Sequence, residues 1–286
     1  MFLSVALCTF NGDKFIQKQI DSILNQSIIV NEIVICDDAS DDKTLGILNI
    51  YQKKYPTIIK LIKNRISLGT IKNFEKAISL TKGELIFLAD QDDIWHKNKV
   101  EIMTNFFKEN SECKLLFTNG FLIDENGNSM NSTIWDKWKF DKNIRHVWKN
   151  NNNAFKDLII NNNKITGATI CFHNSLKKYI TPIAIPYGYW HDAWFGLHAS
   201  AQNGLMFIEE SLIDYRIHNK QQVGISSEIS HEVLTKSNLN CIEKDIFYKK
   251  IHKTYPNKYT SIPILNKQKL IYKILKNIYS SLCKVK

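Results

Sequence analysis

Three carboxylates lie within four positions at the end of an apolar segment. Residues Leu85 to Ala89 are all apolar, and Asp90, Asp92 and Asp93 follow them directly. A short apolar run predicts a buried strand, and ligands bind where such strands end in open α/β sheets. Because neighbouring carboxylates repel one another, a hard divalent cation would stabilise them while also binding phosphate oxygens. Asp90 and Asp92 therefore predict a metal ion that holds a diphosphate; the alternative is a solvated turn in which Asp93 caps the next helix.

The elements that position these carboxylates follow an alternating pattern. Strand-like apolar runs occupy residues 2–10, 32–36 and 58–62, and helix-like spacing of apolar residues lies between them. Strands that alternate with helices predict βαβ units and a mostly parallel sheet. No Gly-x-Gly-x-x-Gly or Gly-x-x-x-x-Gly-Lys-Ser/Thr follows any strand, which argues against a dinucleotide fingerprint or a P-loop. A metal would serve as the partner of the phosphates.

Taken in order, several motifs resemble those of the family 2 nucleotide-sugar glycosyltransferases, which have the GT-A fold. The resemblance covers about residues 5–224. Its motifs are Cys8-Thr9-Phe10-Asn11-Gly12, Cys36-Asp37-Asp38-Ala39-Ser40-Asp41-Asp42, Asn64 with Gly69 and Asn73, and Asp90-Gln91-Asp92-Asp93-Ile94-Trp95. Ala39 replaces the glycine that is usual in this family. The last motif is similar to that of rhamnosyltransferase-like members.

The resemblance implies an α/β protein with a GT-A, Rossmann-like, mostly parallel sheet and a UDP or dTDP sugar as donor. It implies that Mn²⁺ or Mg²⁺ is the cofactor. Asp38 is expected to accept hydrogen bonds from the base or the ribose, while Asp37 turns inward. The residues assigned to the nucleotide sugar are Thr9, Phe10, Asn11, Asp37, Asp38, Asn73, Asp90, Gln91 and Arg216.

The second half of the chain resembles the acceptor side of the family. Residues 165–172 resemble its acceptor-side strand, and residues 189–195 match the place where the family carries a catalytic carboxylate. The resemblance implies that Asp192 is the base that takes the proton of the acceptor hydroxyl. Trp190, His191 and Trp194 are the expected acceptor contacts. Without the resemblance, a cap on the helix from Ala193 to Ala201 is the simpler interpretation of Asp192.

Residues 212–224 resemble the family segment Tyr-Arg-x-His-x-x-Gln. Arg216 and His218 alternate with Ile217, so an extended backbone would direct both to one face. A guanidinium suits diphosphate oxygens, and an imidazole can complete the ligands of Mn²⁺. We therefore expect Arg216 to bind the diphosphate and His218 to bind the metal with Asp92. A lone histidine is more often a hydrogen-bonded structural group, and both interpretations remain open.

The middle of the chain is less informative. Residues 115–118 and 121–124 predict two short strands with a turn at 125–128. Three tryptophans, Trp135, Trp138 and Trp148, follow in the segment 131–163, which is rich in Lys and Asn. Aromatic faces pack well on sugar rings, so this segment is either an acceptor-binding insertion or a subdomain anchored by its tryptophans. The sequence favours neither.

The net charge of +10 resides in the C-terminal tail, since residues 236–286 contain twelve Lys and two acidic residues. Apolar residues recur at helical spacing from Leu270 to Leu282, with Lys away from that stripe. Such a helix suits an anionic membrane surface, and packing on the catalytic domain or on a partner subunit is the equal alternative. The sequence contains no recognised nucleic-acid module, and a nucleic-acid partner is not expected.

A chain of 286 residues with 44% hydrophobic and 23% charged residues is ordinary for a globular enzyme. No apolar stretch reaches 18 residues, and the N-terminus lacks the pattern of a signal peptide. The six cysteines are isolated, which favours reduced thiols. We therefore expect a cytoplasmic protein, peripheral at the inner face of the cell membrane if the tail binds lipid.

Together these features predict an inverting glycosyltransferase that extends a bacterial surface glycan or a lipid-linked glycan. Its expected domains are a GT-A domain at 1–224, with a nucleotide-binding half at 1–118 and an acceptor-binding half at 119–224, and a basic helical extension at 225–286. The alternatives are a sugar-nucleotide pyrophosphorylase, for which the sequence lacks an N-terminal Gly-rich basic loop, and a non-catalytic glycan-binding or membrane scaffold protein.

Overall fold

The computed structural model describes residues 1–160, 162–186, 188–219, 221 and 237–260. The chain divides into two compact units, residues 1–233 and 234–286. In the second unit, α10 (Ser237–Thr254) and α11 (Pro256–Thr260) contact each other. The amphipathic stripe predicted from Leu270 to Leu282 lies outside the described residues. Within the described ranges no helix has the length and apolar character needed to cross a bilayer.

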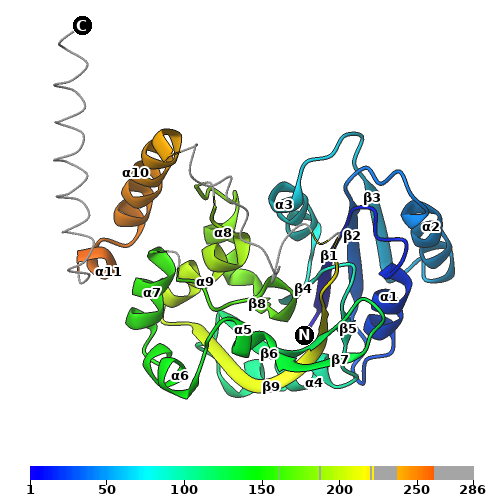
Figure 1. Ribbon diagram of the computed structural model, residues 1–286, viewed down its shortest axis with the longest axis horizontal. Helices are drawn as coiled ribbons and strands as arrows, with labels where there is room; N and C mark the ends of the chain where they lie inside the picture. Colours follow the sequence, from blue (N-terminus) through cyan, green and yellow to red (C-terminus); the bar gives the residue numbers. More distant parts are fainter. Residues whose placement is uncertain (161, 187, 220, 222–236, 261–286) are drawn as a thin grey trace, which may run out of the picture. The chain divides into compact units, whose positions relative to one another are not determined.

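The first half of the larger unit is a parallel α/β sheet, as predicted (Figure 1). Its four strands, in the spatial order β3-β2-β1-β4, are β1 (Leu3–Thr9), β2 (Glu32–Asp37), β3 (Ile59–Lys63) and β4 (Leu85–Ala89). Every residue of β1, β2 and β4 is buried, because helices cover both faces of a parallel sheet. The apolar run before Asp90 is thus a central strand.

Three helices connect these strands. They are α1 (Ile16–Leu24), α2 (Thr44–Lys54) and α3 (Thr70–Leu80). The chain steps outward from β1 to β3 and then returns past β1 to β4, and parallel crossovers are right-handed. For that reason α3 lies on the opposite face of the sheet from α1 and α2 (Figure 1). The return point places the ends of β1 and β4 side by side, where ligands bind in such sheets.

The second half extends the same sheet with mixed pairing, giving nine strands among the described residues. The added strands are β5 (Ile94–Trp95), β6 (Leu115–Ile123), β7 (Ser129–Thr133), β8 (Cys171–His173) and β9 (Leu205–Arg216). Strand β8 pairs antiparallel with β4 and β6, and β6 runs parallel to β9. The long strand β9 curves beneath this half and reaches β5, next to the carboxylate cluster (Figure 1).

The helices of the second half follow the same chain order. They are α4 (Lys99–Glu109), α5 (Ile134–Lys137), α6 (Lys142–Trp148), α7 (Asn151–Ile159), α8 (Lys177–Ile180) and α9 (His191–Ala201), with the 3₁₀ turns η1 (Gly167–Thr169) and η2 (Asn174–Leu176). Helices α7 and α9 pack against each other. This pair fixes the start of α9, which carries Asp192.

Two local predictions were wrong. The two short strands expected at 115–118 and 121–124 form one strand, β6, because Gly120 lets the backbone pass close to Ile134 and Ile213. A Cβ atom at Gly120 would lie 2.8 Å from side-chain atoms of both residues. The strand expected at 165–172 is instead the turn η1 followed by the three residues of β8. Thr169 closes this turn by donating its hydroxyl to the Thr166 carbonyl at 2.7 Å.

The tryptophans of the segment 131–163 divide into two kinds. Trp135 and Trp148 are buried, and their rings meet Phe140 with centroid distances of 5.0 and 5.2 Å. Edge-to-face pairs of this kind add about 0.5–1.5 kcal/mol each beyond the area that they bury. Trp138 differs, because it is half-buried and donates its indole N–H to the Thr166 hydroxyl at 2.9 Å. Two tryptophans therefore anchor the segment, while the third faces a cavity described below.

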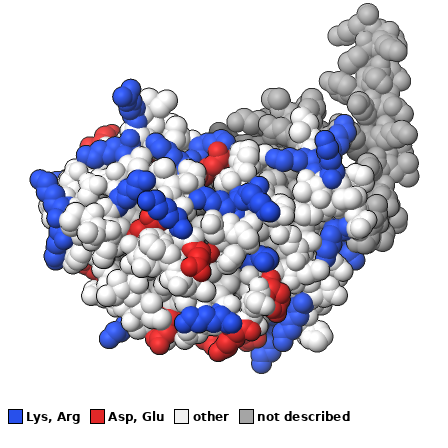
Figure 2. Space-filling view, turned by 180° about the vertical axis from the view of Figure 1, so that it is seen from behind, with Lys and Arg blue, Asp and Glu red and all other residues white. Residues whose placement is uncertain are grey.

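Lys and Arg are spread over the face of the molecule in Figure 2, and Asp and Glu lie between them, mostly in its lower part. This pattern agrees with the sequence of residues 1–235, which is neutral on balance. Cys8, Cys36, Cys113 and Cys171 are buried free thiols, as expected for this part of the chain.

Candidate active site

Two adjoining pockets lie at the carboxyl ends of the parallel strands. The first, named the strand-edge pocket, is lined by Cys8, Thr9, Phe10, Asp38, Thr70, Asn73, Phe74, Asp90, Gln91, Asp92, Tyr215, His218 and Gln221. The second, named the tryptophan pocket, is lined by Thr70, Asp90, Trp138, Asn163, Thr166, Gly167, Trp190, His191, Asp192 and Tyr215. Thr70, Asp90 and Tyr215 line both. The two pockets are therefore halves of one cleft that meet at Asp90.

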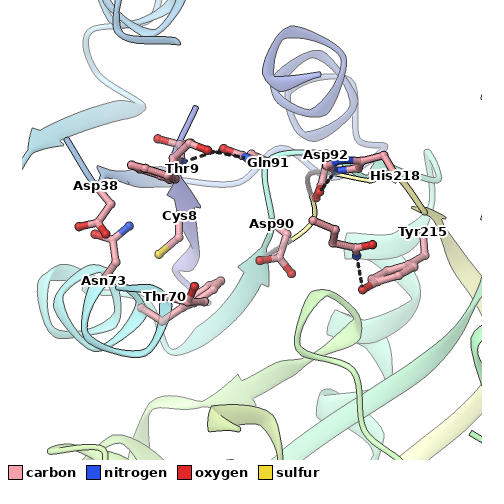
Figure 3. A pocket seen from close by; sticks show the side chains of 13 residues that line it. Cys8, Thr9, Asp38, Thr70, Asn73, Asp90, Gln91, Asp92, Tyr215 and His218 are labelled. Atoms are coloured by element: carbon pink, nitrogen blue, oxygen red, sulfur yellow. Dashed lines mark hydrogen bonds and ion pairs between the residues drawn. The ribbon is translucent and has the colours of Figure 1, made fainter. Parts of the chain in front are cut away.

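Asp37, which ends β2, and Asp38, which follows it, have different contacts. Asp37 is fully buried and accepts hydrogen bonds from the hydroxyls of Thr9 and Ser40 at 2.8 and 2.6 Å. It joins the ends of β1 and β2 and lines neither pocket, in agreement with its predicted inward orientation. Asp38 lines the strand-edge pocket, and Figure 3 shows it beside Asn73 at one end.

The carboxylate of Asp38 holds the loop that precedes α3. It accepts hydrogen bonds from the Asn64 amide and the Leu68 N–H at 2.7 Å, and from the Ser67 hydroxyl and the Gly69 N–H at 2.7 and 2.9 Å. Burial opposes ionisation of Asp38, but these hydrogen bonds outweigh it and lower the pKa of the carboxyl. Gly69 has a φ of 78°, a conformation that side chains rarely adopt. Asp38 is thus saturated by protein donors, whereas the sequence predicted a direct contact with the base or the ribose.

Gln91 connects the Asp90–Asp93 turn to the end of β1. Its amide donates to the Phe10 carbonyl at 3.0 Å and accepts from the Phe10 N–H at 2.8 Å. A Cβ atom on residue 12 would lie 2.3 Å from Gln91 Oε1, so this clamp requires Gly12. Asn11 does not line either pocket; its side chain accepts from the Asp41 N–H at 3.0 Å. Gln91 and Asn11 therefore shape the pocket by fixing loops.

Asp90 projects between the two ends of the strand-edge pocket (Figure 3). Among the described residues its carboxylate has no hydrogen-bond partner. Burial, together with the nearby charges of Asp92 and Asp192, raises the pKa of Asp90 to about 7, and the charge of Lys99 opposes this shift. This carboxylate is therefore buried beside two like charges, with Lys99 as a nearby positive charge.

Asp92 and His218 form the other end of the strand-edge pocket, with Asp92 Oδ2 2.8 Å from His218 Nε2 (Figure 3). Carboxylate oxygen and imidazole nitrogen suit Mn²⁺, and the neighbouring carboxylates of Asp90 and Asp92 favour a cation nearby. No three His, Cys, Asp or Glu side chains in the described ranges surround a common point as a complete metal cage. The donor set fits an ion whose remaining ligands come from a bound diphosphate or water.

The structure corrects the prediction for Arg216. Its guanidinium is buried and donates to the Asp92 carbonyl at 2.8 Å and to the Asp124 and Glu125 carbonyls at 3.1 and 3.2 Å. It lines neither pocket, so it supports the carboxylate turn from behind instead of facing a diphosphate. Strand β9 ends at Arg216, and the alternation that would direct Arg216 and His218 to one face does not continue beyond it.

Asp192 lies in the first turn of α9 and faces the tryptophan pocket. Its Oδ1 accepts from the Ala193 N–H at 2.6 Å and from the Asn163 amide at 3.3 Å. Burial raises the pKa of Asp192 to about 7 although these hydrogen bonds act in the opposite direction. The alternative interpretation, a helix cap, does not apply, because Trp190 is the N-cap residue and no side chain caps this end of α9. The side chain of Asp192 lines the cleft instead.

Of the three expected acceptor contacts, two line the tryptophan pocket and one does not. Trp190 is 38% exposed and His191 is buried, and both line the tryptophan pocket. Trp194 is fully buried, lines neither pocket and donates its indole N–H to the Ile180 carbonyl at 2.9 Å. Trp190 is the N-cap residue of α9 and has an extended backbone, whereas Trp194 lies inside the helix. Trp194 is therefore a core residue, contrary to the prediction.

Four site residues were missed from the sequence, and a fifth, Trp138, was named only as part of the segment 131–163. Thr70, Trp138, Asn163, Thr166 and Tyr215 line the cleft. Tyr215 had a signal, because it is the tyrosine of the Tyr-Arg-x-His segment. The other four come from separate elements that only the folded chain brings together.

Lys99, at the start of α4, is a buried cation that the sequence did not single out. Its ammonium donates to the Ala168 carbonyl in η1 at 2.7 Å and lies 4.0 Å from the centroid of Trp95. Burial lowers the pKa of Lys99 to about 7, although the charges of Asp93 and Asp90 oppose the shift. Lys99 thus links the carboxylate turn to the wall of the tryptophan pocket.

Comparison with known proteins agrees with this geometry. Residues 4–177 match glycosyl transferase family 2. An uncharacterised glycosyltransferase of Methanocaldococcus jannaschii is 29% identical over 220 residues, which cover 76% of this chain and 71% of that protein. A dTDP-rhamnosyl transferase of Shigella flexneri is 37% identical over 99 residues, covering 33% of this chain and 34% of that protein.

Solved structures show the same fold. S. aureus TarS in complex with UDP-GlcNAc aligns with a TM-score of 0.59 and 18% identity, covering 91% of this chain and 73% of that chain. The mannosyltransferase PcManGT from Pyrobaculum calidifontis, in complex with GDP-Man and Mn²⁺, aligns with a TM-score of 0.56 and 15% identity, covering 76% and 57%. The chain spans 61% of TarS in its UDP complex.

Proposed function

The chain belongs to glycosyl transferase family 2, and we propose that it transfers a sugar from a UDP or dTDP sugar to a hydroxyl of a glycan, with inversion at the anomeric carbon. One observation carries the proposal. The strand-edge and tryptophan pockets share Asp90, Thr70 and Tyr215, so a donor in the first pocket and an acceptor in the second would meet beside Asp90.

The strand-edge pocket suits the nucleotide diphosphate. Asp92 and His218 would hold a divalent ion, Mn²⁺ or Mg²⁺, which when bound neutralises charge on the departing diphosphate. Asn73 and Asp38 form the other end of this pocket, where the nucleoside would lie. Thr9 and Phe10 form the floor between them, held by Asp37 and Gln91. The chain's own residues thus bind and orient the donor.

The tryptophan pocket suits the acceptor, and Asp192 is its candidate base. A carboxylate with a pKa near 7 is a better proton acceptor than an ordinary Asp and is still substantially ionised at neutral pH. Proton transfer from the acceptor hydroxyl to Asp192 would let that oxygen attack the anomeric carbon directly. A single displacement of this kind inverts the configuration of the carbon.

The biological setting is proposed from the relatives. The name of the Shigella relative supports a dTDP sugar, and the TarS complex supports a UDP sugar. The proposal therefore includes both donors. We propose extension of a bacterial surface polysaccharide, with catalysis assigned to residues 1–224 and attachment to an anionic membrane surface assigned to 225–286. The acceptor would then be a glycan or a lipid-linked glycan.

The test is turnover of nucleotide sugars by the full chain with and without Mn²⁺. Release of UDP or dTDP together with a glycoside of inverted configuration would support the proposal. Consumption of a nucleoside triphosphate would favour a pyrophosphorylase instead. If neither reaction occurs with any donor, a glycan-binding protein without turnover becomes the better explanation.

A further inference from the structure

The tryptophan pocket contains no basic side chain among its described lining residues. Its only charged groups are the carboxylates of Asp90 and Asp192, and the others are indole, amide, hydroxyl and imidazole groups. Lys164 is close in sequence, but its ammonium donates to the Trp138 carbonyl at 2.9 Å and does not line the pocket. Lys99 does not line the pocket either, and its ammonium donates to the Ala168 carbonyl. An anionic ligand would therefore meet two carboxylates and no cation from the described lining.

The two indoles of this pocket differ from the tryptophans of the core. Trp190 is 38% exposed, whereas Trp135, Trp148 and Trp194 are at most 4% exposed. Trp138 is held in one orientation, because its indole N–H donates to the Thr166 hydroxyl. Indoles on a cavity wall can pack against the C–H face of a sugar ring, and rigid aromatic groups lose little conformational freedom on doing so.

His191 adds an imidazole whose nitrogens are both unsatisfied. The ring is buried, stacks on Phe74 with a centroid distance of 4.5 Å and meets the edge of Phe195 at 5.6 Å. Neither Nδ1 nor Nε2 has a hydrogen-bond partner among the described residues, and a Cβ atom on Gly167 would lie 3.1 Å from Nε2. Burial lowers the pKa of His191 to about 4, so the ring is neutral at pH 7.

A neutral imidazole offers one N–H donor and one acceptor. A buried polar atom without a partner is unfavourable, so a ligand that both donates and accepts is favoured at this position. A sugar hydroxyl does both. A carboxylate or a phosphate lacks the donor and also brings a negative charge towards Asp90 and Asp192, a juxtaposition that opposes binding.

We infer that the tryptophan pocket receives the terminal residue of the acceptor as a neutral sugar and rejects a uronic acid or a phosphorylated polyol. The inference rests on the proposed function, which assigns this pocket to the acceptor. Trp138 and Trp190 would contact the ring, and His191 would bind one of its hydroxyls. His191 is then a specificity-determining residue, and Asp192 contributes to specificity through its charge as well as acting as the base.

Matched pairs of phenyl glycosides test this inference. Phenyl β-glucoside and phenyl β-glucuronide share one ring and differ at C6, where a hydroxymethyl group is replaced by a carboxylate; the galactose pair has the same relation. Phenyl rhamnoside and phenyl N-acetylglucosaminide extend the neutral set. Binding to the full chain, saturated with UDP or dTDP and Mn²⁺, is measured by ligand-observed NMR. We expect at least one neutral glycoside to bind at least tenfold more tightly than every charged glycoside.

Variants identify the pocket and its charge. Trp190→Ala should weaken binding of the neutral glycoside at least fivefold, whereas Phe121→Ala, at an exposed aromatic residue that lines neither pocket, should not change it. Asp192→Asn should narrow the difference between the members of a pair, because it removes one of the two like charges. His191→Phe keeps an aromatic ring and should weaken neutral binding without strengthening charged binding.

Equal or tighter binding of a charged glycoside would overturn the inference, as would the absence of binding by every neutral glycoside. The proposed function fails by a different observation, namely that no nucleoside diphosphate is released from any donor. Release of nucleotide with preference for a charged acceptor would leave the transferase assignment intact and remove only the neutral-sugar inference.

Discussion

At the scale of single residues, Asp38 both lines the strand-edge pocket and stabilises the loop before α3. Its two oxygens accept four hydrogen bonds from residues 64–69, which fill the lone pairs of a carboxylate. A nucleotide that also contacted Asp38 would have to replace one of these donors. The residue therefore prepares the end of the strand-edge pocket by ordering the loop that forms it.

We expect Asp38→Ala to lower the free energy of unfolding by about 1–3 kcal/mol, because the loop loses four hydrogen bonds to a charged acceptor. Urea unfolding measures this change. Asp41→Ala, at an exposed carboxylate nearby, is the matched control and should change stability by less than about 0.5 kcal/mol. Equal stability of the two variants would contradict the structural role of Asp38.

The same contacts give the stability of the protein a defined dependence on pH. The pKa of Asp38 is lower in the folded state than in an unfolded chain, where it is about 3.9. Its contribution is therefore complete above that value and is lost as pH falls through the folded pKa. The stability difference between the parent and Asp38→Asn should shrink at acid pH and stay constant between about pH 6 and 8.

The proposed metal ligands give a second prediction at this scale. Asp92→Ala should abolish the part of UDP or dTDP affinity that depends on Mn²⁺, since the variant removes a carboxylate ligand and leaves the nucleoside end of the pocket unchanged. Calorimetry with and without Mn²⁺ separates the two contributions. If parent and variant bind equally under both conditions, Asp92 has no metal role.

At the scale of secondary-structure elements, Lys99 connects α4 to η1 across the base of the cleft. Lys99→Met should destabilise the fold by about 1–3 kcal/mol, because the buried Ala168 carbonyl loses its hydrogen-bond donor and the Trp95 ring loses the ammonium. Lys97→Met, at an exposed position two residues earlier, should have little effect. Thermal unfolding of both variants tests the assignment, and a stable Lys99→Met protein would refute it.

The elements of the first half could be predicted because each has a strong local pattern. Strands β1, β2 and β4 are continuous apolar runs that end in polar residues, and the helices between them have apolar residues at helical spacing. The second half could not be predicted as well. In the sequence, Gly120 indicates a break between two strands. In the structure it lets the backbone of one strand pack closely against Ile134 and Ile213, a contact that the sequence does not show.

The same distinction applies to the site. Asp90, Asp92, Asp192 and His218 stand out because clustered carboxylates and polar residues at strand ends suggest chemistry. Arg216 and Trp194 were misassigned, since a residue type states what a side chain can bind but not which way it points. His191 could be singled out as an aromatic neighbour of Asp192, but the absence of hydrogen-bond partners around its ring is visible only in the structure.

At the scale of the whole molecule, the glycosyltransferase motifs all lie within residues 1–224, whereas the net positive charge lies in residues 236–286. We expect a chain that ends at Lys258 to keep its activity on a short soluble acceptor and to lose sedimentation with anionic vesicles. Added salt should release the full-length chain from the anionic vesicles, because charges are screened over about 10 Å at 0.1 M ionic strength. Vesicle binding that is unchanged by truncation would remove the membrane assignment.

The central claim also belongs to the whole molecule, because it requires two halves of the chain to act across one cleft. Asp192 lies on the acceptor side and contributes nothing to the proposed metal site. Transfer by the parent should increase as pH rises through about 7, since the base must lose its proton. The pKa of Asp90 is also about 7, so the pH dependence of transfer reflects Asp90 and Asp192 together. A variant of one residue is needed to assign the proton transfer to Asp192.

The decisive measurement is sugar transfer and nucleotide affinity for Asp192→Asn, with Asp141→Asn as the control for the same chemical change at an exposed helix cap. We predict that Asp192→Asn binds UDP or dTDP as the parent does, while transfer falls by about 10²-fold to 10⁴-fold, the range typical of general base catalysis. The control should retain both properties, and the parent's product should have the inverted configuration. Transfer by Asp192→Asn at the parent rate, or a product of retained configuration, would contradict the proposed mechanism.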